Sequence, residues 1–432
     1  MVKRVLMIAF HYPPLRGSSG IQRTLKFSRY LLEYGWQPVV LTSNPRAYPS
    51  TSNDQIAEIP AEVPVHRTFA LDTSRHLAYK GRYLGFLALP DRWVSWWLGA
   101  VSRGLSLIRH SRPHVIWSTY PIATAHLIGL TLHRLTGIPW VADMRDPMTD
   151  ASHPTNKLTR KVYQWIERQA IIHSTKVLCT TPGTVKLYRS RFPHVPASRF
   201  CLIENGYDEE NFLSSETGVG PAPLGNRPVV LVHSGVIYPS ERDPRPLFEA
   251  LAELLNAGKI SPDSLQVVLR ATGHDEYLRK LLVQYGVEAV VTLAPPVPYR
   301  EALSEMLTSD GLLLLQAANC NHQIPAKLYE YLRARRPILA LTDPDGDTAN
   351  KLRSAGIDTI ARLDSKNDIV RGILHFLDLL TSGKGQIPSG EAVSSNSREA
   401  RTKELAFVLD EVLGTRGECA SNEEVLVGDD RT

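Results

Sequence analysis

Short apolar runs alternate with longer amphipathic runs along nearly all of the 432 residues, and no other sequence feature limits the fold as strongly. Short apolar runs are typical of buried strands, whereas longer runs with apolar residues at every third or fourth position are typical of helices. Strands that alternate with helices form βαβ units, which build a mostly parallel sheet. In the first half the predicted strands are VLMIAF, PVVLTS, VPVHRT, HVIWST, PWVADM, KVLCTT and FCLIEN.

The alternation is interrupted by the stretch SSETGVGPAPLGNRP, whose Gly, Pro and Ser content is typical of a linker. It restarts with PVVLVHSG, LQVVLRATG, AVVTLAP, GLLLLQA, RPILAL and TIARL. We therefore predict an α/β protein of two doubly wound, Rossmann-like parallel-sheet domains, with ligands bound in a cleft at the carboxyl ends of the strands. The predicted parts are a first domain at 1–213, a linker at 214–227, a second domain at 228–395, a helix at 396–414 and a disordered acidic tail at 415–432.

The first 213 residues are strongly basic. They contain 26 Lys and Arg residues against 14 Asp and Glu residues, a balance of +12, whereas the remainder has 23 against 30, a balance of −7. A basic half predicts contact with an anionic surface, either a membrane or a nucleic acid. No zinc finger, RNP-type aromatic motif or basic helix with heptads occurs, so we predict no nucleic-acid partner. Surface charge that only keeps the protein soluble is the alternative.

The cysteine pattern, the N-terminal apolar run and the longest uncharged run together predict a protein of a reducing, cytoplasmic compartment. The four cysteines lie far apart, without a C-x-x-C pair, which argues against a disulfide framework and a structural zinc site. The N-terminal apolar run stops at His11 without a cleavage site, so a strand is predicted there and not a signal peptide. The uncharged run from Arg112 to Arg134 contains prolines and histidines and indicates a strand, a turn and a helix, not a membrane span.

The segment LPDRWVSWWLGAVSRGLSLIRHSRP, residues 89–113, combines three tryptophans with four arginines. Trp and Arg along a helix suit a membrane interface and a lipid-linked acceptor. The alternative is a helix packed on the sheet, with its Trp side buried and its arginines solvated.

Two loops of the first half have the composition of binding loops. In HYPPLRGSSGIQR a strand leads through a glycine-rich loop into a helix, an arrangement that binds anions through backbone N–H groups. The alternative is a tight turn capped by Ser19. In VADMRDPM three charges follow a strand, and they form either a self-neutralised turn or a cluster facing the cleft. The predicted acceptor-side and phosphate-loop residues are Gly17, Ser18, Ser19, Gly20, Asp143, Arg145 and, in the turn ENGYD, Asn205, with Asp146 as a contact to hydroxyl groups.

The second half repeats this logic after its own strands. VHSGVIYPSERDPRPLFEAL places Gly235 at a strand end and Arg242 and Arg245 before a helix, where arginines suit a diphosphate. RATGHDEYLRK gives a further strand-to-helix junction at Gly273. The alternative for both arginines is a solvated helix end.

The stretch NHQIPAKLYEYLRARRPILAL places Lys327 and Glu330 on one face of the first turns of a helix. They form either a surface pair or part of a site. In the second case the preceding loop, residues His322, Gln323 and Ile324, cradles phosphate together with the helix N-terminus, and Glu330 accepts hydrogen bonds from a ribose diol.

The order and spacing of WVADMRDP, ENGYD and IPAKLYEYLRARRPILAL resemble glycosyltransferase family 4-like proteins, the retaining, nucleotide-sugar-dependent enzymes of the GT-B fold. The resemblance covers most of the chain. It implies that the second half holds a nucleotide sugar, that the first half holds the acceptor, and that the last helix crosses back to the first half.

The family pattern also implies residue roles, with one departure. In the family two Glu residues separated by seven others flank the donor; Glu330 occupies the second place, and His322 occupies the first. Gly20 matches the glycine-rich first loop, and Arg242 lies where a basic residue contacts the diphosphate, with Arg245 as its competitor. The substitution of His322 for Glu puts the usual contact to the sugar hydroxyls, and with it the stereochemical outcome, in question.

We predict a glycosyltransferase of the hexosyltransferase type, acting in cell-surface polysaccharide biosynthesis on a glycan or lipid-linked acceptor. The predicted catalytic residues are Arg242, Lys327, Glu330 and Asp146, and neither a metal nor a cofactor is expected besides the nucleotide sugar as co-substrate. In TDPDGDT the acidic spacing departs from a calcium loop and favours a helix cap. The alternatives are a nucleotide-sugar epimerase of the same architecture and a non-catalytic sugar-nucleotide-binding partner of an assembly complex.

Overall fold

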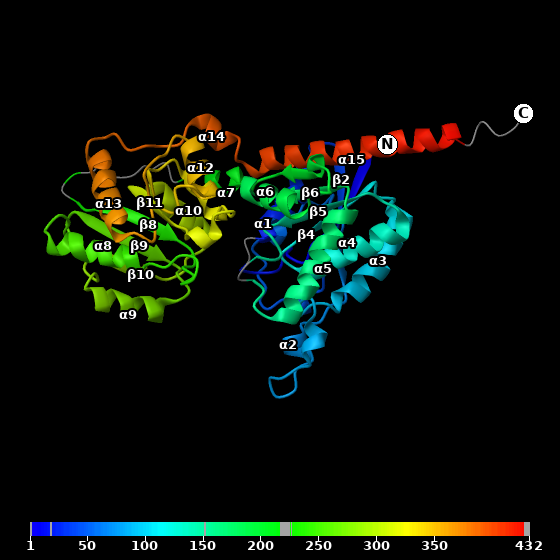
Figure 1. Cartoon of the computed structure of the whole chain (residues 1–432), viewed down its shortest axis with the longest axis horizontal. Helices are drawn as coiled ribbons and strands as arrows, with labels where there is room; N and C mark the ends of the chain where they lie inside the picture. The colour runs from blue at the N-terminus through cyan, green and yellow to red at the C-terminus, as the bar shows by residue number, and fades with distance from the viewer. Residues whose placement is uncertain (1, 18–19, 151–152, 217–224, 226, 427–432) are drawn as a thin grey trace, which may run out of the picture. The chain divides into compact units, whose positions relative to one another are not determined.

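The structure is a computed structural model that describes residues 2–17, 20–150, 153–216, 225 and 227–426, with only the backbone described for 415–426. The chain divides into two compact units, which are called unit 1 and unit 2 (Figure 1). Unit 1 comprises Met1–Glu204 and Arg398–Thr432, and unit 2 comprises Asn205–Ser397.

Unit 1 is built on a seven-stranded sheet in the order β3-β2-β1-β4-β5-β6-β7, in which every neighbouring pair is parallel. Its strands are β1 (Lys3–Ile8), β2 (Trp36–Ser43), β3 (Val65–Thr68), β4 (Val115–Thr119), β5 (Trp140–Arg145), β6 (Lys176–Cys179) and β7 (Phe200–Leu202). Its helices are α1 (Gly20–Tyr30), α2 (Thr73–His76), α3 (Trp96–Ser111), α4 (Ala123–Thr136), α5 (Lys157–His173), α6 (Pro182–Arg191) and α15 (Arg398–Leu426).

Helices cover both faces of this sheet because successive strand residues point to opposite faces. Val5 and Met7 of β1 lie in one apolar core cluster together with residues of α1 and α15. Leu6 and Ile8 of the same strand lie in a second cluster with residues of α3, α4 and α5 (Figure 1). The sheet grows in opposite directions from β1 and from β4, so the boundary between these strands is a topological switch point.

Unit 2 repeats the architecture on a six-stranded parallel sheet in the order β10-β9-β8-β11-β12-β13. Its strands are β8 (Val229–Ser234), β9 (Leu265–Arg270), β10 (Val291–Ala294), β11 (Gly311–Leu315), β12 (Ile338–Leu341) and β13 (Ile360–Ala361). Its helices are α7 (Glu209–Leu213), α8 (Arg245–Asn256), α9 (Asp275–Tyr285), α10 (Tyr299–Thr308), α11 (Ala326–Ala334), α12 (Asp347–Ser354), α13 (Lys366–Thr381) and α14 (Gly390–Ser394). The predicted fold class of two doubly wound parallel-sheet domains is confirmed, and the switch point of unit 2 lies between β8 and β11.

Two boundaries differ from the predicted ones. Residues Asn205 to Leu213 belong to unit 2, because Phe212 of α7 is buried in its core and Glu209 forms an ion pair with Arg333 of α11. The last helix continues past Gly414 to Leu426, so the predicted disordered tail begins within a helix. Residues 217–224 and 226 of the predicted linker, and 427–432 of the tail, lie outside the described residues.

The three tryptophans of segment 89–113 find hydrogen-bond partners inside unit 1. Trp93 Nε1 donates to the carbonyl oxygen of Ala47. Trp96 Nε1 donates to Thr68 Oγ1, and Trp97 Nε1 donates to Thr131 Oγ1, each of the three bonds being 3.0 Å long. For these tryptophans, the bonds therefore favour the alternative prediction, in which the segment packs against the rest of unit 1. In the part of the chain that the structure describes, no helix combines the length and the apolar character needed to span a membrane.

Candidate functional site

The ammonium group of Lys327 lies at the carboxyl end of the unit 2 sheet, against the end of β8. Its Nζ is 3.0 Å from Nε2 of His233, and Nδ1 of that imidazole is 2.9 Å from the carbonyl oxygen of Leu313 in β11. A carbonyl oxygen only accepts, so we assign the imidazole proton to Nδ1, and Nε2 accepts from Lys327. His233, which is fully buried, thereby fixes the ammonium at the switch point between β8 and β11.

Arg242 brings a second cation to this place. Its Nη1 donates to the carbonyl oxygen of Val236 at 2.6 Å, and its guanidinium stacks on Tyr238, 5.5 Å from the ring centroid. Its Nε is buried without a hydrogen-bond partner in the described part of the chain. We call Lys327, Arg242 and His233 the basic cluster.

The electrostatics of the basic cluster favour an anionic ligand. Burial, reinforced by the charge of Arg242, holds the pKa of Lys327 well below its ordinary value, and Glu330 acts in the opposite direction. Burial and then the charge of Lys327 hold the pKa of His233 well below its ordinary value, so this imidazole is neutral at neutral pH. An incoming anion compensates the crowded positive charge and restores the proton affinity of Lys327.

The two glycines predicted for this site lie in conformations that suit glycine. Gly235 has φ +111°, and a Cβ there would lie 3.1 Å from Nζ of Lys327. Gly273 has φ +74°, and its Cβ would lie 3.3 Å from the Val236 side chain. A side chain at either position would strain the backbone. At Gly235 it would also crowd Lys327 of the basic cluster, and at Gly273 it would crowd Val236.

Glu330 lies on α11 together with Lys327, and its carboxylate already has a partner. The hydroxyl of Tyr299, the first residue of α10, donates to Oε1 of Glu330 at 2.7 Å. The next residue, Tyr331, ties α11 to β8, because its hydroxyl accepts from the backbone N–H of Ser234 at 3.0 Å. Pro325 is the N-cap residue of α11, and its side chain makes no capping hydrogen bond to the N–H groups of the first turn.

The remaining donor-side residues surround this helix start or lie apart from it. His322 is exposed, Gln323 is half-buried and Ile324 is buried. The backbone of Gln323 is held at both ends, since its N–H donates to Cys320 O at 2.9 Å and its carbonyl accepts from Thr348 Oγ1 at 3.0 Å. Arg245 pairs with Asp243 at 2.6 Å with both side chains partly in solvent. Of the two competing arginines, Arg242 is the one whose charge acts on Lys327.

In unit 1, Arg145 is the predicted residue with the most unusual backbone. It ends β5 at φ +57°, where the β5–β6 register shifts. A non-glycine residue in this conformation is strained, and such strain clusters at functional sites. Its Nη1 donates to Tyr120 O at 3.3 Å, and burial together with the charge of Arg23 lowers the pKa of Arg145 to about 10. The guanidinium therefore stays charged at neutral pH.

His11, which follows β1, is close enough to Arg145 to feel its charge. Burial and then Arg145 lower the pKa of His11 to about 3, so a neutral imidazole accompanies the guanidinium. Sequence reasoning missed both His11 and His233 as site residues. The only available signal was a histidine at or just after the end of a first strand in each half.

The structure gives Asp143 a structural position and not the predicted one at the acceptor side. Asp143 is fully buried and accepts from Nε and Nη2 of Arg23 at 2.9 and 3.0 Å, and from Thr119 Oγ1 at 2.8 Å. Arg23 also donates to the carbonyl oxygens of Ile203 and Glu204. This carboxylate therefore joins α1, β4 and β5, and its oxygens are occupied inside the unit.

The other predicted first-half residues take different positions. Asp146 and Gly17 are exposed, Gly17 at φ +84°, whereas Gly20 is buried as the first residue of α1. Ser18 and Ser19 lie outside the described residues. Asn205 is half-buried and belongs to unit 2.

The acidic run TDPDGDT is engaged in local hydrogen bonds. Oδ2 of Asp343 accepts from Asn321 Nδ2 at 2.7 Å and its Oδ1 from the N–H of Asp345 at 3.1 Å, while Asp347 lies in the first turn of α12. Among the described residues, no group of three or more His, Cys, Asp or Glu side chains has the arrangement of a metal site.

The comparison with known protein families supports the resemblance noted in the sequence. Residues 20–206 match the Glycosyl transferase 4-like domain, which spans most of the unit 1 sheet. The predicted resemblance to glycosyltransferase family 4-like proteins is confirmed. Among curated proteins, none matches the sequence.

Solved structures share the fold at low sequence identity. Sucrose-phosphate synthase from Thermosynechococcus elongatus superposes with a TM-score of 0.61 at 12% identity, covering 98% of this chain and 100% of that one. The Anabaena protein HepE in complex with UDP gives 0.60 at 11%, with coverage of 97% and 100%. UDP-GlcNAc 2-epimerase from Neisseria meningitidis bound to UDP-GlcNAc gives 0.54 at 13%, with coverage of 94% and 100%. These likenesses establish the GT-B fold.

Proposed function

We propose that this chain, a glycosyltransferase 4-like protein of the GT-B fold, moves a sugar from a nucleoside-diphosphate sugar to a glycan or lipid-linked acceptor. The observation that carries the proposal is the basic cluster at the switch point of unit 2, in a chain whose residues 20–206 match a glycosyl transferase 4-like domain. HepE, which shares the fold, has been crystallised with UDP and with UDP-glucose. We further propose hexosyl transfer with retention, without a metal, in cell-surface polysaccharide biosynthesis at the cytoplasmic side of a membrane.

The residues of unit 2 suit the departure of a diphosphate. When the bond from the anomeric carbon to the diphosphate oxygen breaks, the electron pair goes to that oxygen and negative charge grows on the phosphate. Preorganised cations stabilise such charge most where water is excluded. Lys327, held by His233, and Nε of Arg242 are assigned to this task, together with the N–H groups at the start of α11.

Replacement of Glu330 by Ala is expected to weaken UDP binding by about 10- to 100-fold, because a carboxylate that accepts from a ribose diol contributes roughly 1.5–3 kcal/mol. Tyr299→Phe is the matched control, since it removes only the hydroxyl that donates to Glu330. Calorimetric titration with UDP compares the three proteins. Equal losses in both variants would mean that Glu330 acts by holding Tyr299, and unchanged affinity in Glu330→Ala would remove the ribose assignment.

Binding of UDP-glucose is expected to take up a proton at Lys327. The free protein holds the pKa of this ammonium low, and the diphosphate raises it again. Between these two pKa values the complex carries more protons than the free protein, so affinity falls as pH rises; below the lower value the pH dependence vanishes. Titrations in buffers of different ionisation enthalpy measure the uptake. Lys327→Arg, which keeps the charge at all these pH values, should abolish it, and uptake that persists in this variant would assign the proton elsewhere.

The overall proposal is tested with purified protein and a panel that includes UDP-glucose, UDP-GlcNAc and GDP-mannose. Thermal shift identifies the donor, and product analysis with and without glycan or lipid-linked acceptors identifies the reaction. Transfer to an acceptor supports the proposal, and the anomeric configuration of the product reports retention. Conversion of a nucleotide sugar without acceptor would favour an epimerase, the activity named for one structural neighbour. Nucleotide binding without turnover would favour a non-catalytic partner, for which His322 in place of Glu is the motivating residue.

The acceptor side of the proposal rests on unit 1. Its strained, charged Arg145 lies with the neutral imidazole of His11, and Asp146 is exposed in the same loop. We propose that these groups contact the hydroxyl or phosphate groups of the acceptor. A lipid-linked acceptor is presented at a bilayer, so contact of the basic first half with an anionic membrane belongs to the same proposal.

A further inference from the structure

Exposed apolar side chains gather in one short segment of unit 1, residues 77–87, which we call the aromatic hairpin. Tyr79 is 78% exposed, Leu84 62% and Phe86 65%, and Leu77 and Tyr83 are more than two-fifths exposed. The segment follows α2 and projects from unit 1 (Figure 1). Among the described residues, those that line an open hollow of about 730 Å³ here all belong to this segment, from Leu77 to Leu87. Large apolar side chains exposed together in this way mark an interaction site.

The tip of the aromatic hairpin has a defined backbone. Tyr79 and Arg82 exchange both backbone hydrogen bonds, at 2.8 and 3.0 Å. Lys80 and Gly81 between them have φ values of +51° and +75°, the signs required by the tight two-residue turn that matches strand twist. The ammonium of Lys80 lies over the Tyr79 ring, 5.6 Å from its centroid. The tip therefore presents two cations and an aromatic ring on a fixed turn.

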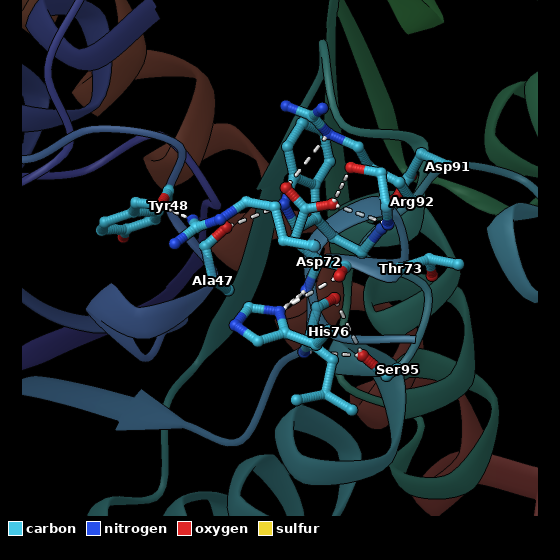
Figure 2. Close-up of polar contacts among 12 residues, drawn as sticks. Ala47, Tyr48, Asp72, Thr73, His76, Asp91, Arg92 and Ser95 are labelled. Carbon is cyan, nitrogen blue, oxygen red and sulfur yellow. Dashed lines mark hydrogen bonds and ion pairs between the residues drawn. The ribbon is translucent and has the colours of Figure 1, made fainter. Parts of the chain in front are cut away.

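Polar contacts attach the residues at the base of the aromatic hairpin to the rest of unit 1 (Figure 2). Asp72 caps α2 by accepting from the N–H of Ser74 at 3.0 Å, and its other oxygen lies 3.5 Å from Nε of Arg92. The N–H of Thr73 donates to Arg92 O at 2.8 Å, and that of Asp72 to Nδ1 of His76 at 3.0 Å. These contacts hold the ends of the aromatic hairpin in place, and its apolar side chains remain exposed to solvent.

The charge of the aromatic hairpin identifies the chemistry of its partner. Between Thr73 and Pro90 the chain contains Arg75, Lys80 and Arg82 and not one Asp or Glu. Tyr and Phe rings beside basic side chains suit the boundary between lipid headgroups and acyl chains. Anionic lipid attracts nearby basic side chains, whereas a neutral apolar partner leaves them without counter-charge. The pattern therefore complements an anionic bilayer surface.

We propose that the aromatic hairpin docks unit 1 on an anionic lipid bilayer, with Leu84 and Phe86 entering the interface and Lys80 and Arg82 contacting lipid phosphates. The hairpin gives the proposed membrane contact a defined position on unit 1. It rests on the proposed function in one respect, namely that a lipid-linked acceptor is the reason for the contact. It assigns the contact to the hairpin and not to the tryptophans of segment 89–113, whose indole N–H groups bond inside unit 1.

The test is co-sedimentation of the full chain, without nucleotide, with vesicles of phosphatidylglycerol and phosphatidylcholine. Leu84→Ser/Phe86→Ser is expected to lower the partition coefficient at least about tenfold. The matched control is Leu98→Ser/Leu135→Ser on α3 and α4, since both of these residues are 62% exposed and lie outside the hairpin. Lys80→Gln/Arg82→Gln should lower the partition coefficient by a similar factor at low salt. Lys157→Gln/Lys161→Gln removes the same number of positive charges from exposed positions of α5 and should lower the partition coefficient much less.

Slower hydrogen exchange of residues 77–87 on vesicles, with unchanged exchange in the core strands, would support the assignment. Equal binding by the hairpin variants and the wild type, absence of wild-type binding at low salt, or binding only to a protein would overturn it. Thermal unfolding that matches the wild type shows that each variant is folded. Hydrolysis of a nucleotide sugar in solution should be unchanged by the hairpin variants, so failure of this inference is distinguishable from failure of the proposed function.

Discussion

Replacement of Lys327 by Met lowers the affinity for UDP by about 100-fold or more, if the basic cluster binds the diphosphate. Removing one partner of a buried, hydrogen-bonded charge pair costs roughly 2–5 kcal/mol in binding, and about 1.4 kcal/mol is a factor of ten. The ammonium is fixed by His233 and is crowded by Arg242, so it is prepared for an anion before the anion arrives. Isothermal titration calorimetry with UDP measures the loss.

Two variants separate this effect from general changes of charge or fold. Lys280→Met removes a lysine of the same unit whose side chain is 75% exposed, and it should bind UDP like the wild type. His233→Ala keeps the ammonium but removes its anchor, so an intermediate loss is expected. In Lys327→Met the loss of a costly buried charge and the loss of the bond to His233 act in opposite directions on stability. Wild-type affinity in Lys327→Met would remove the basic cluster from the donor site.

The alternation of strands and helices was sufficient to predict two parallel sheets, because both halves have short apolar runs separated by amphipathic ones. The same pattern placed Lys327 and Glu330 on one helix that starts beside a strand end, and α11 has that position. Local signals of this kind act over a few residues, which is the range that spacing and turn composition report.

Long-range pairings account for what the sequence did not reveal. His233 lies in a strand that otherwise reads as apolar core, and its partner Lys327 is 94 positions away. Asp143 follows an apolar run, and this context predicts a position in the acceptor loop, but Arg23, 120 positions earlier, donates to both of its oxygens. Unit 1 ends at an earlier residue than predicted for the same reason, since α7 packs with residues that come much later in the chain.

Removal of the Asp143 carboxylate, as Asp143→Ala, is expected to destabilise unit 1 by about 3–5 kcal/mol, because the Arg23 guanidinium is then buried without its counter-charge. Both side chains are at most 1% exposed, so water does not replace the lost partner. Urea unfolding, followed by hydrogen exchange of the α1 and β5 amides, assigns the loss to unit 1. In Asp364→Ala, which breaks a surface pair with Arg362 in unit 2, the loss should stay below about 1 kcal/mol.

The double variant Arg23→Met/Asp143→Leu distinguishes a structural carboxylate from a ligand-binding one. If Asp143 serves only to balance Arg23, replacing both by apolar side chains removes the uncompensated charge and recovers much of the stability lost in Asp143→Ala. The carbonyl oxygens of Ile203 and Glu204, which accept from Arg23, lose their donors and limit that recovery. A loss below about 1 kcal/mol in Asp143→Ala would mean that the carboxylate is exchangeable with solvent, and would return Asp143 to the acceptor side where its sequence context placed it.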